Sequence, residues 1–378
     1  MFFLSKSRVL TLAIMTFAVA IPRGFALLNI DGARNQLFVF GSVSFSYSSN
    51  IFSEATGRGD YTMSANAGLE LKRRAGIIAV ESTLKFDYQR FGEHTDQNSI
   101  NPSFFIIFNK TSGRTTGAIT VNAFRESRSD SAVNLRTSSW NFPLGLTLKY
   151  PINDKLYITS GTSYLQRRYT DTTVLANLTD YSESVDFFYV YTSKLDLIGG
   201  YRIRVSNTST GGDTMDHWFN VGATGGLFAK LNGTVRLGYQ VRDVSTPTSE
   251  KFTHLNAAVS VTWPMTRKLS LAGQISRDFN TIATGASVDS AGANLSASYA
   301  FNRKLEFGSA VGYGRNQFLG RNQPARRDDF FSWDISAGYK FNEHLRIGAS
   351  YTYFRNWSSL SFSDFSRQGY SIDASSRF

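Results

Sequence analysis

The sequence contains no cysteine among its 378 residues and only four histidines, His94, His217, His254 and His344. Without cysteine, the chain forms no disulfide, no thiolate metal site and no haem attachment of the Cys-x-x-Cys-His type. The histidines are widely separated, and none has another histidine three or four residues away, as many metal sites require. We therefore expect no metal, haem or other cofactor.

Sequence signatures of common catalytic sites are also missing. The chain has no Gly-x-Ser-x-Gly elbow, no phosphate-binding P-loop and no dinucleotide-binding glycine motif. These absences predict that it is not an enzyme. The formal net charge of +11 is spread along the chain without a Lys/Arg run. This distribution fits contact with anionic lipopolysaccharide better than nucleic acid binding, which we do not expect.

Long apolar runs and domain linkers are absent after the first 26 residues, so we expect one domain over 27–378. The N-terminus has Lys6 and Arg8, an apolar core over 9–21 and small residues near Ala20 and Ala26. This order is typical of a secretory signal peptide over 1–26, cleaved after Ala20 or Ala26. Its core is shorter than the ~20 residues that a transmembrane helix needs.

Aromatic and small polar residues are abundant, with 31 Phe, 18 Tyr and 31 Gly beside only seven Pro. This composition is typical of β-rich proteins. Apolar and polar side chains alternate, as in 304–314, where Leu305, Phe307, Val311 and Tyr313 share one face. Period-two alternation predicts strands. We expect about eighteen, at 36–48, 61–72, 76–90, 102–110, 115–127, 138–150, 155–169, 183–192, 194–206, 216–228, 231–243, 251–263, 267–280, 289–301, 304–316, 330–341, 345–357 and 367–378.

Short turns such as 72–75 and 302–304 alternate with longer polar links such as 89–101, 169–183 and 317–329. A soluble sandwich seldom needs so many long hairpins. In lipid, an antiparallel sheet must pair every backbone group, so it closes on itself. We therefore predict an all-β fold, a closed antiparallel transmembrane barrel of about 18 strands with short periplasmic turns and longer extracellular loops. Such a barrel encloses an aqueous bore.

The five tryptophans fall near the predicted strand ends, where amphipathic rings form a girdle at headgroup depth. We assign this girdle to Trp140, Trp218, Trp263, Trp333 and Trp357.

Alternation also places charged side chains toward the bore. The candidates are Arg202, Arg204, Arg236, Arg242, Asp196 and Asp278. A cluster of inward arginines favours anions or acidic polymers, because a water-filled bore with low-dielectric walls focuses the field. The alternative is a ladder of ion pairs that stiffens the wall. The sequence leaves both interpretations open.

Residues 42–76, 100–128 and 341–378 carry a family resemblance. They resemble the β-barrel porin family of outer-membrane proteins, often associated with exopolysaccharide-export gene clusters. The resemblance implies location in the cell outer membrane and a role in passing polysaccharide across it. The last strand is similar to the signal read by the barrel-assembly machinery, with Tyr370, Ile372 and Phe378 on its apolar face.

We therefore expect an outer-membrane channel that exports polysaccharide or passes polar solutes, in contact with lipid, lipopolysaccharide and the barrel-assembly machinery. A periplasmic polysaccharide-export component is an expected partner. Two alternatives remain: a scaffold or sheath around a partner export or electron-transfer protein, and a general diffusion porin. A surface adhesin ranks last, because the loops are modest in length and contain no repeats.

Overall fold

The computed structural model describes residues 28–30, 34–74, 76–170, 174–210, 212–245, 249–320 and 326–378. The expected signal peptide over 1–26 lies outside these ranges. The described residues form nineteen strands in one sheet and two short 3₁₀ turns, η2 (Thr95–Gln97) and η3 (Ser361–Ser363). Within the same residues, no helix has the length and apolar character to cross a bilayer.

The strands follow one another along the chain with nothing but turns and loops between them. They are β1 (Leu28–Ile30), β2 (Asn35–Ser48), β3 (Asp60–Arg73), β4 (Ile78–Phe91), β5 (Ser99–Lys110), β6 (Thr116–Asp130), β7 (Leu135–Pro151), β8 (Leu156–Tyr169), β9 (Leu178–Thr192), β10 (Leu195–Thr208), β11 (Asp213–Phe228), β12 (Leu231–Ser245), β13 (Glu250–Pro264), β14 (Leu269–Thr281), β15 (Ser287–Ala300), β16 (Leu305–Phe318), β17 (Arg327–Lys340), β18 (Leu345–Ser358) and β19 (Phe365–Arg377).

The sheet closes into a barrel. Each strand from β2 onward pairs antiparallel with the next, and β19 pairs with β2 from Gly369↔Ser48 to Arg377↔Phe40. The three-residue β1 only extends the inner end of β2, so nineteen strands minus β1 leave an 18-strand barrel. The predicted closed antiparallel barrel is confirmed. Closure matters because it leaves no unpaired strand edge facing lipid.

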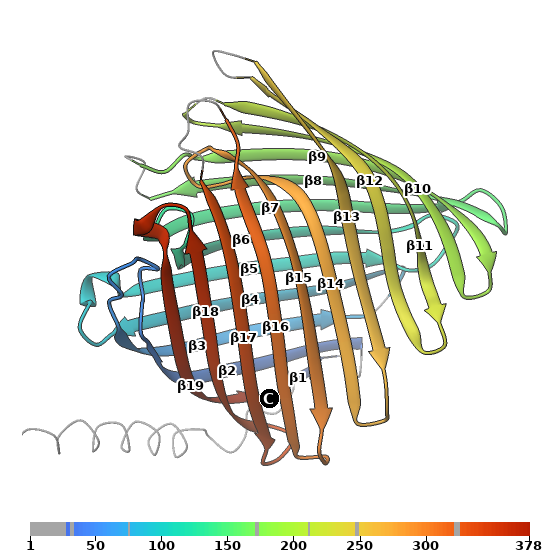
Figure 1. Cartoon of the computed structure of the whole chain (residues 1–378). Coiled ribbons are helices and arrows are strands. Elements are labelled where there is room, and N and C mark those ends of the chain that lie inside the picture. Colours follow the sequence, from blue (N-terminus) through green and yellow to red (C-terminus); the bar gives the residue numbers. More distant parts are fainter. Residues whose placement is uncertain are drawn as a thin grey trace, which may run out of the picture.

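Connections on one rim are short turns, such as 152–155, and the C-terminus lies at this rim (Figure 1). Links on the other rim are shorter than predicted, because the strands extend further. The link predicted at 169–183 covers only 170–177, since β9 begins at Leu178. Alternation of apolar residues stops before the backbone ladder does, so it underestimates the strands where they leave the hydrocarbon layer.

The outer face of the wall carries large apolar side chains. On β16, Phe307, Val311 and Tyr313 are 42%, 42% and 51% exposed, respectively. Gly308 and Gly312 occupy the opposite face of the same strand. A wall of this kind keeps its apolar side chains out of water only when hydrocarbon surrounds it.

Two hairpins leave the wall near the outer rim. Pairing of β5 with β6 stops at Ser103↔Phe124, although β6 continues to Asp130 beside β7. Likewise, β13 and β14 stop pairing at Ala257↔Arg277, although β14 continues to Thr281 beside β15. The hairpin β6–β7 therefore separates from β5, and the hairpin β14–β15 separates from β13. Strands beside the outer loops arch over the upper end of the barrel (Figure 1).

Candidate functional site

The tip of the β6–β7 hairpin, residues 131–134, crosses the outer mouth and binds three other loops. The Asn134 side chain donates to the Ser53 carbonyl oxygen at 2.5 Å and accepts a hydrogen bond from the Ser363 hydroxyl. Arg326 donates to the Ala132 carbonyl oxygen at 2.6 Å. These contacts fix the tip on several sides, so the hairpin is a built part of the mouth.

The β14–β15 tip, residues 282–286, reaches the same place. Val133 of the first tip packs against a buried apolar cluster of Tyr169, Leu175 and Ala283. The Ala176 amide also donates to the Ala283 carbonyl oxygen at 2.7 Å. Because the two hairpins start from widely separated parts of the wall and meet through this cluster, they narrow the mouth together.

Four charged residues hold the β14–β15 hairpin in its inward position. Asp216 is 1% exposed and accepts from Arg242 Nε at 2.6 Å and from Arg204 Nε at 2.8 Å. Arg204 also donates to the Phe279 carbonyl oxygen and lies 3.4 Å from the Asp278 carboxylate. Arginine side chains of the β10–β12 wall thus satisfy backbone and side-chain acceptors of the leaning strand.

Every arginine that the sequence places toward the bore is paired with a carboxylate. Arg204 and Arg242 share Asp216, Arg202 contacts Asp278 at 3.0 Å, and Arg236 contacts Asp186 at 2.8 Å. This arrangement matches the ion-pair ladder rather than a free cationic filter. Arg202, Arg204 and Arg242 gather in one cluster with Asp278, while Arg236 lies outside it.

Asp196, the other predicted acidic residue, accepts a hydrogen bond from the Tyr157 hydroxyl at 2.6 Å.

The Arg236–Asp186 pair depends on a glycine. Arg236 donates to both Asp186 oxygens, at 2.8 and 3.0 Å, in a bidentate contact. Asp186 lies opposite Gly200 on the neighbouring strand, and a Cβ at Gly200 would come within 1.8 Å of its Oδ1. A side chain at position 200 is therefore incompatible with this carboxylate position.

Open space remains on both sides of β6. A cavity of about 500 Å³ lies against β2, β3, β18 and β19, and one of about 310 Å³ lies against β8–β10 and β14. A third, of about 720 Å³, lies against β4–β6. Arg128 on β6 lines all three cavities, with its side chain 54% exposed. Arg128 therefore borders the open space on both sides of β6.

Arg128, Arg136 and Arg367 line the 500 Å³ cavity, and the sequence did not single them out. Arg136 shares its β7 face with Trp140 and Phe142, a face that alternation assigns to lipid. Arg136 borders the bore because the β6–β7 hairpin leaves the wall. The alternation of side chains does not predict where a hairpin leaves the wall.

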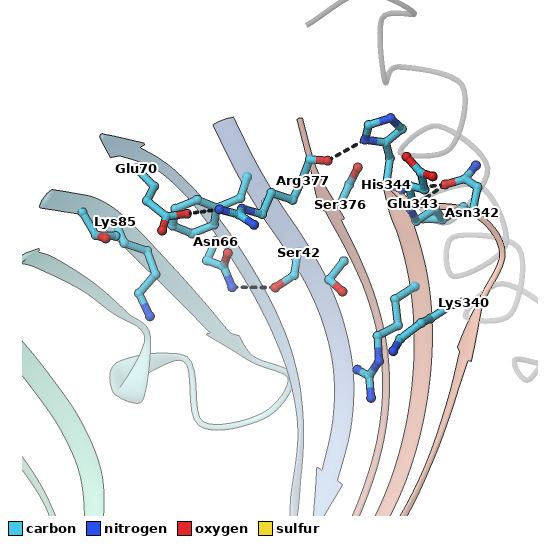
Figure 2. Close-up of a pocket in the computed structure, with 16 residues that line it drawn as sticks. Ser42, Asn66, Glu70, Lys85, Lys340, Asn342, Glu343, His344, Ser376 and Arg377 are labelled. Atoms are coloured by element: carbon cyan, nitrogen blue, oxygen red, sulfur yellow. Dashed lines mark hydrogen bonds and ion pairs between the residues drawn. The ribbon is translucent and has the colours of Figure 1, made fainter. Parts of the chain in front are cut away.

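The inner end of the bore has its own cavity, of about 700 Å³, beside the seam where β19 meets β2 (Figure 2). Arg377 donates to Glu70 at 2.6 Å across this seam. Lys340 and Arg346 contact Glu306 at 3.2 and 3.0 Å. These neighbouring charges are paired, which fits a role in closing the barrel.

Four of the predicted girdle residues, Trp140, Trp263, Trp333 and Trp357, are 37–45% exposed. Trp218 differs from the prediction. It lies opposite Arg202 in the β10–β11 ladder, and the Arg202 guanidinium sits 3.7 Å from the centre of its ring. Trp218 therefore faces the bore, because it shares its parity with Asp216 on β11.

The predicted assembly signal lies at the closing strand. Tyr370 and Ile372 are 51% and 59% exposed, and the Phe378 backbone pairs with that of Val39. Its recognition by the assembly machinery stays a prediction. In the part of the chain that the structure describes, no three His, Asp or Glu side chains converge as metal ligands would.

An 18-strand closed barrel with an apolar outer belt and a polar bore defines a transmembrane channel of the porin class. The family comparison agrees: residues 201–378 match the family described as "Putative beta-barrel porin 2". The resemblance to β-barrel porins is thus confirmed over these residues, and the fold is that of an outer-membrane β-barrel porin. Porins are channels rather than enzymes.

Solved structures with the same fold are outer-membrane porins of low sequence identity. OpdK of Pseudomonas aeruginosa with vanillate has a TM-score of 0.52 and 9% identity, covering 90% of this chain and 99% of its own. OccK2 (OpdF) of the same species with glucuronate has a TM-score of 0.51 and 9% identity, covering 91% and 98%. OccAB3 of Acinetobacter baumannii has a TM-score of 0.50 and 10% identity, covering 92% and 100%. No curated protein matches the sequence.

Proposed function

We propose that this porin passes small polar solutes by diffusion and does not export a polymer. The observation that carries the proposal is the meeting of the β6–β7 and β14–β15 hairpins over the outer mouth through Val133 and Ala283. A polysaccharide chain needs an uninterrupted bore along its whole length. The tip at 131–134, fixed by hydrogen bonds to other loops, stands in that route.

The size of the remaining space supports the same conclusion. The cavities beside β6 measure about 310, 500 and 720 Å³. Cavities of roughly 300–1,000 Å³ accommodate single small molecules. The two similar barrels described as complexes hold vanillate and glucuronate, which are molecules of this size.

The sheath hypothesis finds less support. A partner protein inside the barrel would have to displace both hairpins and break the Asp216 contacts with Arg204 and Arg242. Such buried pairs are costly to separate, because each charge then loses its partner. A general diffusion porin therefore fits better than a sheath or a polysaccharide conduit.

Swelling of proteoliposomes in isotonic sugar solutions tests the proposal. We expect glucose to enter quickly and an oligosaccharide of six or more units to be excluded. A variant that lacks residues 127–138, with Glu126 and Ser139 joined by two glycines, should admit the larger sugar. Glu126 and Ser139 are paired neighbours, so a tight turn can join them.

Three outcomes would contradict the proposal. They are no swelling in any sugar, entry of the oligosaccharide through the intact protein, and an unchanged size limit after removal of the hairpin.

A further inference from the structure

The 500 Å³ cavity beside β6 combines three arginines with no acidic residue. Arg128 and Arg136 come from the leaning hairpin, and Arg367 comes from β19. The other arginines described for the bore each contact a carboxylate. None of the described residues that line this cavity is Asp or Glu.

Arg136 is a partly buried guanidinium, and its partners in the part of the chain that the structure describes are neutral groups. Its Nη2 donates to Gln89 Oε1 at 2.7 Å and to the Ser127 carbonyl oxygen at 3.0 Å. Its guanidinium carbon lies 4.7 Å from the centre of the Phe91 ring. Both hydrogen bonds come from one nitrogen, so the other N–H groups remain for a ligand.

Arg367 lines the same cavity from β19. Its Nη1 donates to Ser53 Oγ at 3.2 Å, and its guanidinium carbon lies 5.4 Å from the centre of the Phe354 ring. The Ser53 hydroxyl in turn lies 2.5 Å from the Ser129 hydroxyl on β6. Within the described residues, neither Arg136 nor Arg367 forms an ion pair with a carboxylate.

Arg128, unlike Arg136 and Arg367, has an acidic neighbour. It contacts Glu126 at 3.5 Å, and Glu126 faces the neighbouring cavity rather than this one. The cavity therefore has a net positive lining, which attracts anions more strongly than the same charges would in bulk water. Removing a charge from water without a partner is costly, so an anion between Arg136 and Arg367 stabilises both.

The rest of the lining consists largely of hydroxyl groups. Ser46, Thr62, Ser64, Ser350, Thr352 and Ser371 face the cavity from the barrel wall. Hydroxyls both donate and accept hydrogen bonds, as the hydroxyls of a sugar do. Arginine, by contrast, suits the two oxygens of a carboxylate, which it can bind in parallel.

We propose that this cavity is a binding site for small polyhydroxylated carboxylates, such as sugar acids, and that Arg136 and Arg367 bind the carboxylate. The proposal rests on the diffusion of small solutes through the bore and names the chemical class that binds on the way. The four arginines expected from the sequence are paired with carboxylates and brace the wall. Arg136 and Arg367, in contrast, bind the solute.

Calorimetric titration of the purified full-length barrel in detergent tests this site without requiring conductance. Sodium glucuronate is the probe, glucose is the neutral control and sodium phosphate tests any oxyanion. The site variant is Arg136→Gln with Arg367→Gln. The control variant, Lys340→Gln with Arg346→Gln, removes the same charge from the inner end of the bore, where both residues contact Glu306.

We expect the intact protein to bind glucuronate and not glucose, and the site variant to bind at least about tenfold more weakly, as loss of charge-assisted hydrogen bonds implies. The control variant should change affinity less than about threefold, because salt screens distant charges. Equal losses in both variants, or no glucuronate binding by the intact protein, would overturn the site. Phosphate binding as tight as that of glucuronate would overturn the carboxylate preference.

Folding is checked separately, because a folded barrel migrates faster in unheated electrophoresis samples. If the double variant fails to fold, Arg367→Gln alone replaces it, since the Arg367 side chain has one hydrogen bond to the described residues, the bond to Ser53. Glucuronate binding without sugar-driven swelling supports the site and refutes the proposed channel. Sugar-driven swelling without glucuronate binding supports the proposed channel and refutes the site.

Discussion

Asp216 shows how single buried charges set the shape of the mouth. Its carboxylate is 1% exposed and serves two arginines from neighbouring strands, Arg204 and Arg242. Those arginines then reach carbonyl oxygens of β14, at Phe279 and Asn280. One acidic side chain thus supports the connection between the β10–β12 wall and the leaning hairpin.

The first prediction concerns this carboxylate. Asp216→Asn should destabilise the barrel by roughly 3–5 kcal/mol, because it removes the counter-charge of the buried Arg242 and one of the two carboxylates that Arg204 contacts. Urea titration in detergent, followed by tryptophan fluorescence, measures the free energy of unfolding. Asp154→Asn, in the exposed turn 152–155, is the control and should be neutral. Equal stability of the two variants would contradict the structural role of Asp216.

Two adjacent glycines of β10 provide the second prediction. A Cβ at Gly200 would overlap the Asp186 carboxylate, whereas a Cβ at Gly199 meets nothing within 4 Å. Gly200→Ala should therefore cost about 1–3 kcal/mol, as overpacking does, and Gly199→Ala should be neutral or slightly stabilising. The same urea titration measures both. A Gly200→Ala variant as stable as Gly199→Ala would show that Asp186 moves freely.

At the scale of elements, the β6–β7 hairpin depends on its tip. Asn134 adopts a positive φ of 55°, which asparagine tolerates better than most residues. Its side chain also bonds Ser53 and Ser363. The tip residue therefore combines a turn conformation with anchoring to two other loops.

Asn134→Gly is the third prediction, because glycine keeps the positive φ and removes only the side-chain bonds. We expect a larger and noisier single-channel conductance, since the tip then loses two of the hydrogen bonds that hold it in the mouth. Planar bilayer recordings measure this effect. Lys230→Gly, at another positive φ of 65° in the inner turn, is the control and should leave the conductance unchanged. Identical traces from Asn134→Gly and the intact protein would contradict a role of the Asn134 side chain in holding the tip in the mouth.

The strands were predictable from the sequence, but the leaning hairpins were not. Alternation identifies β16 because each residue meets hydrocarbon on one face and water on the other. The ladder of β5 and β6 ends at Ser103↔Phe124 through contacts between distant loops, which hydropathy does not report. Arg136 and Trp218 were missed or misplaced for related reasons. To place either side chain, one must know which face of the strand it occupies and where the strand runs. The composition of a segment determines neither.

At the scale of the whole molecule, closure of the sheet and alternation of apolar and polar side chains both follow from contact with lipid. A sheet that meets lipid on its outer face must have no free edge, and β19 supplies the closing partner for β2. The bore then follows from the number of strands, and the two hairpins reduce it from inside. Function therefore depends on a wall set by the sequence pattern and on a mouth set by tertiary contacts.

Cysteine scanning along β16 tests this central claim most directly, because the chain has no native cysteine. In proteoliposomes, a small charged thiol reagent should modify a cysteine at Ala310 and spare one at Val311, which is 42% exposed on the outer wall. A lipid-soluble reagent should show the opposite preference. Equal modification of both positions by the charged reagent would contradict a wall with lipid outside and water inside.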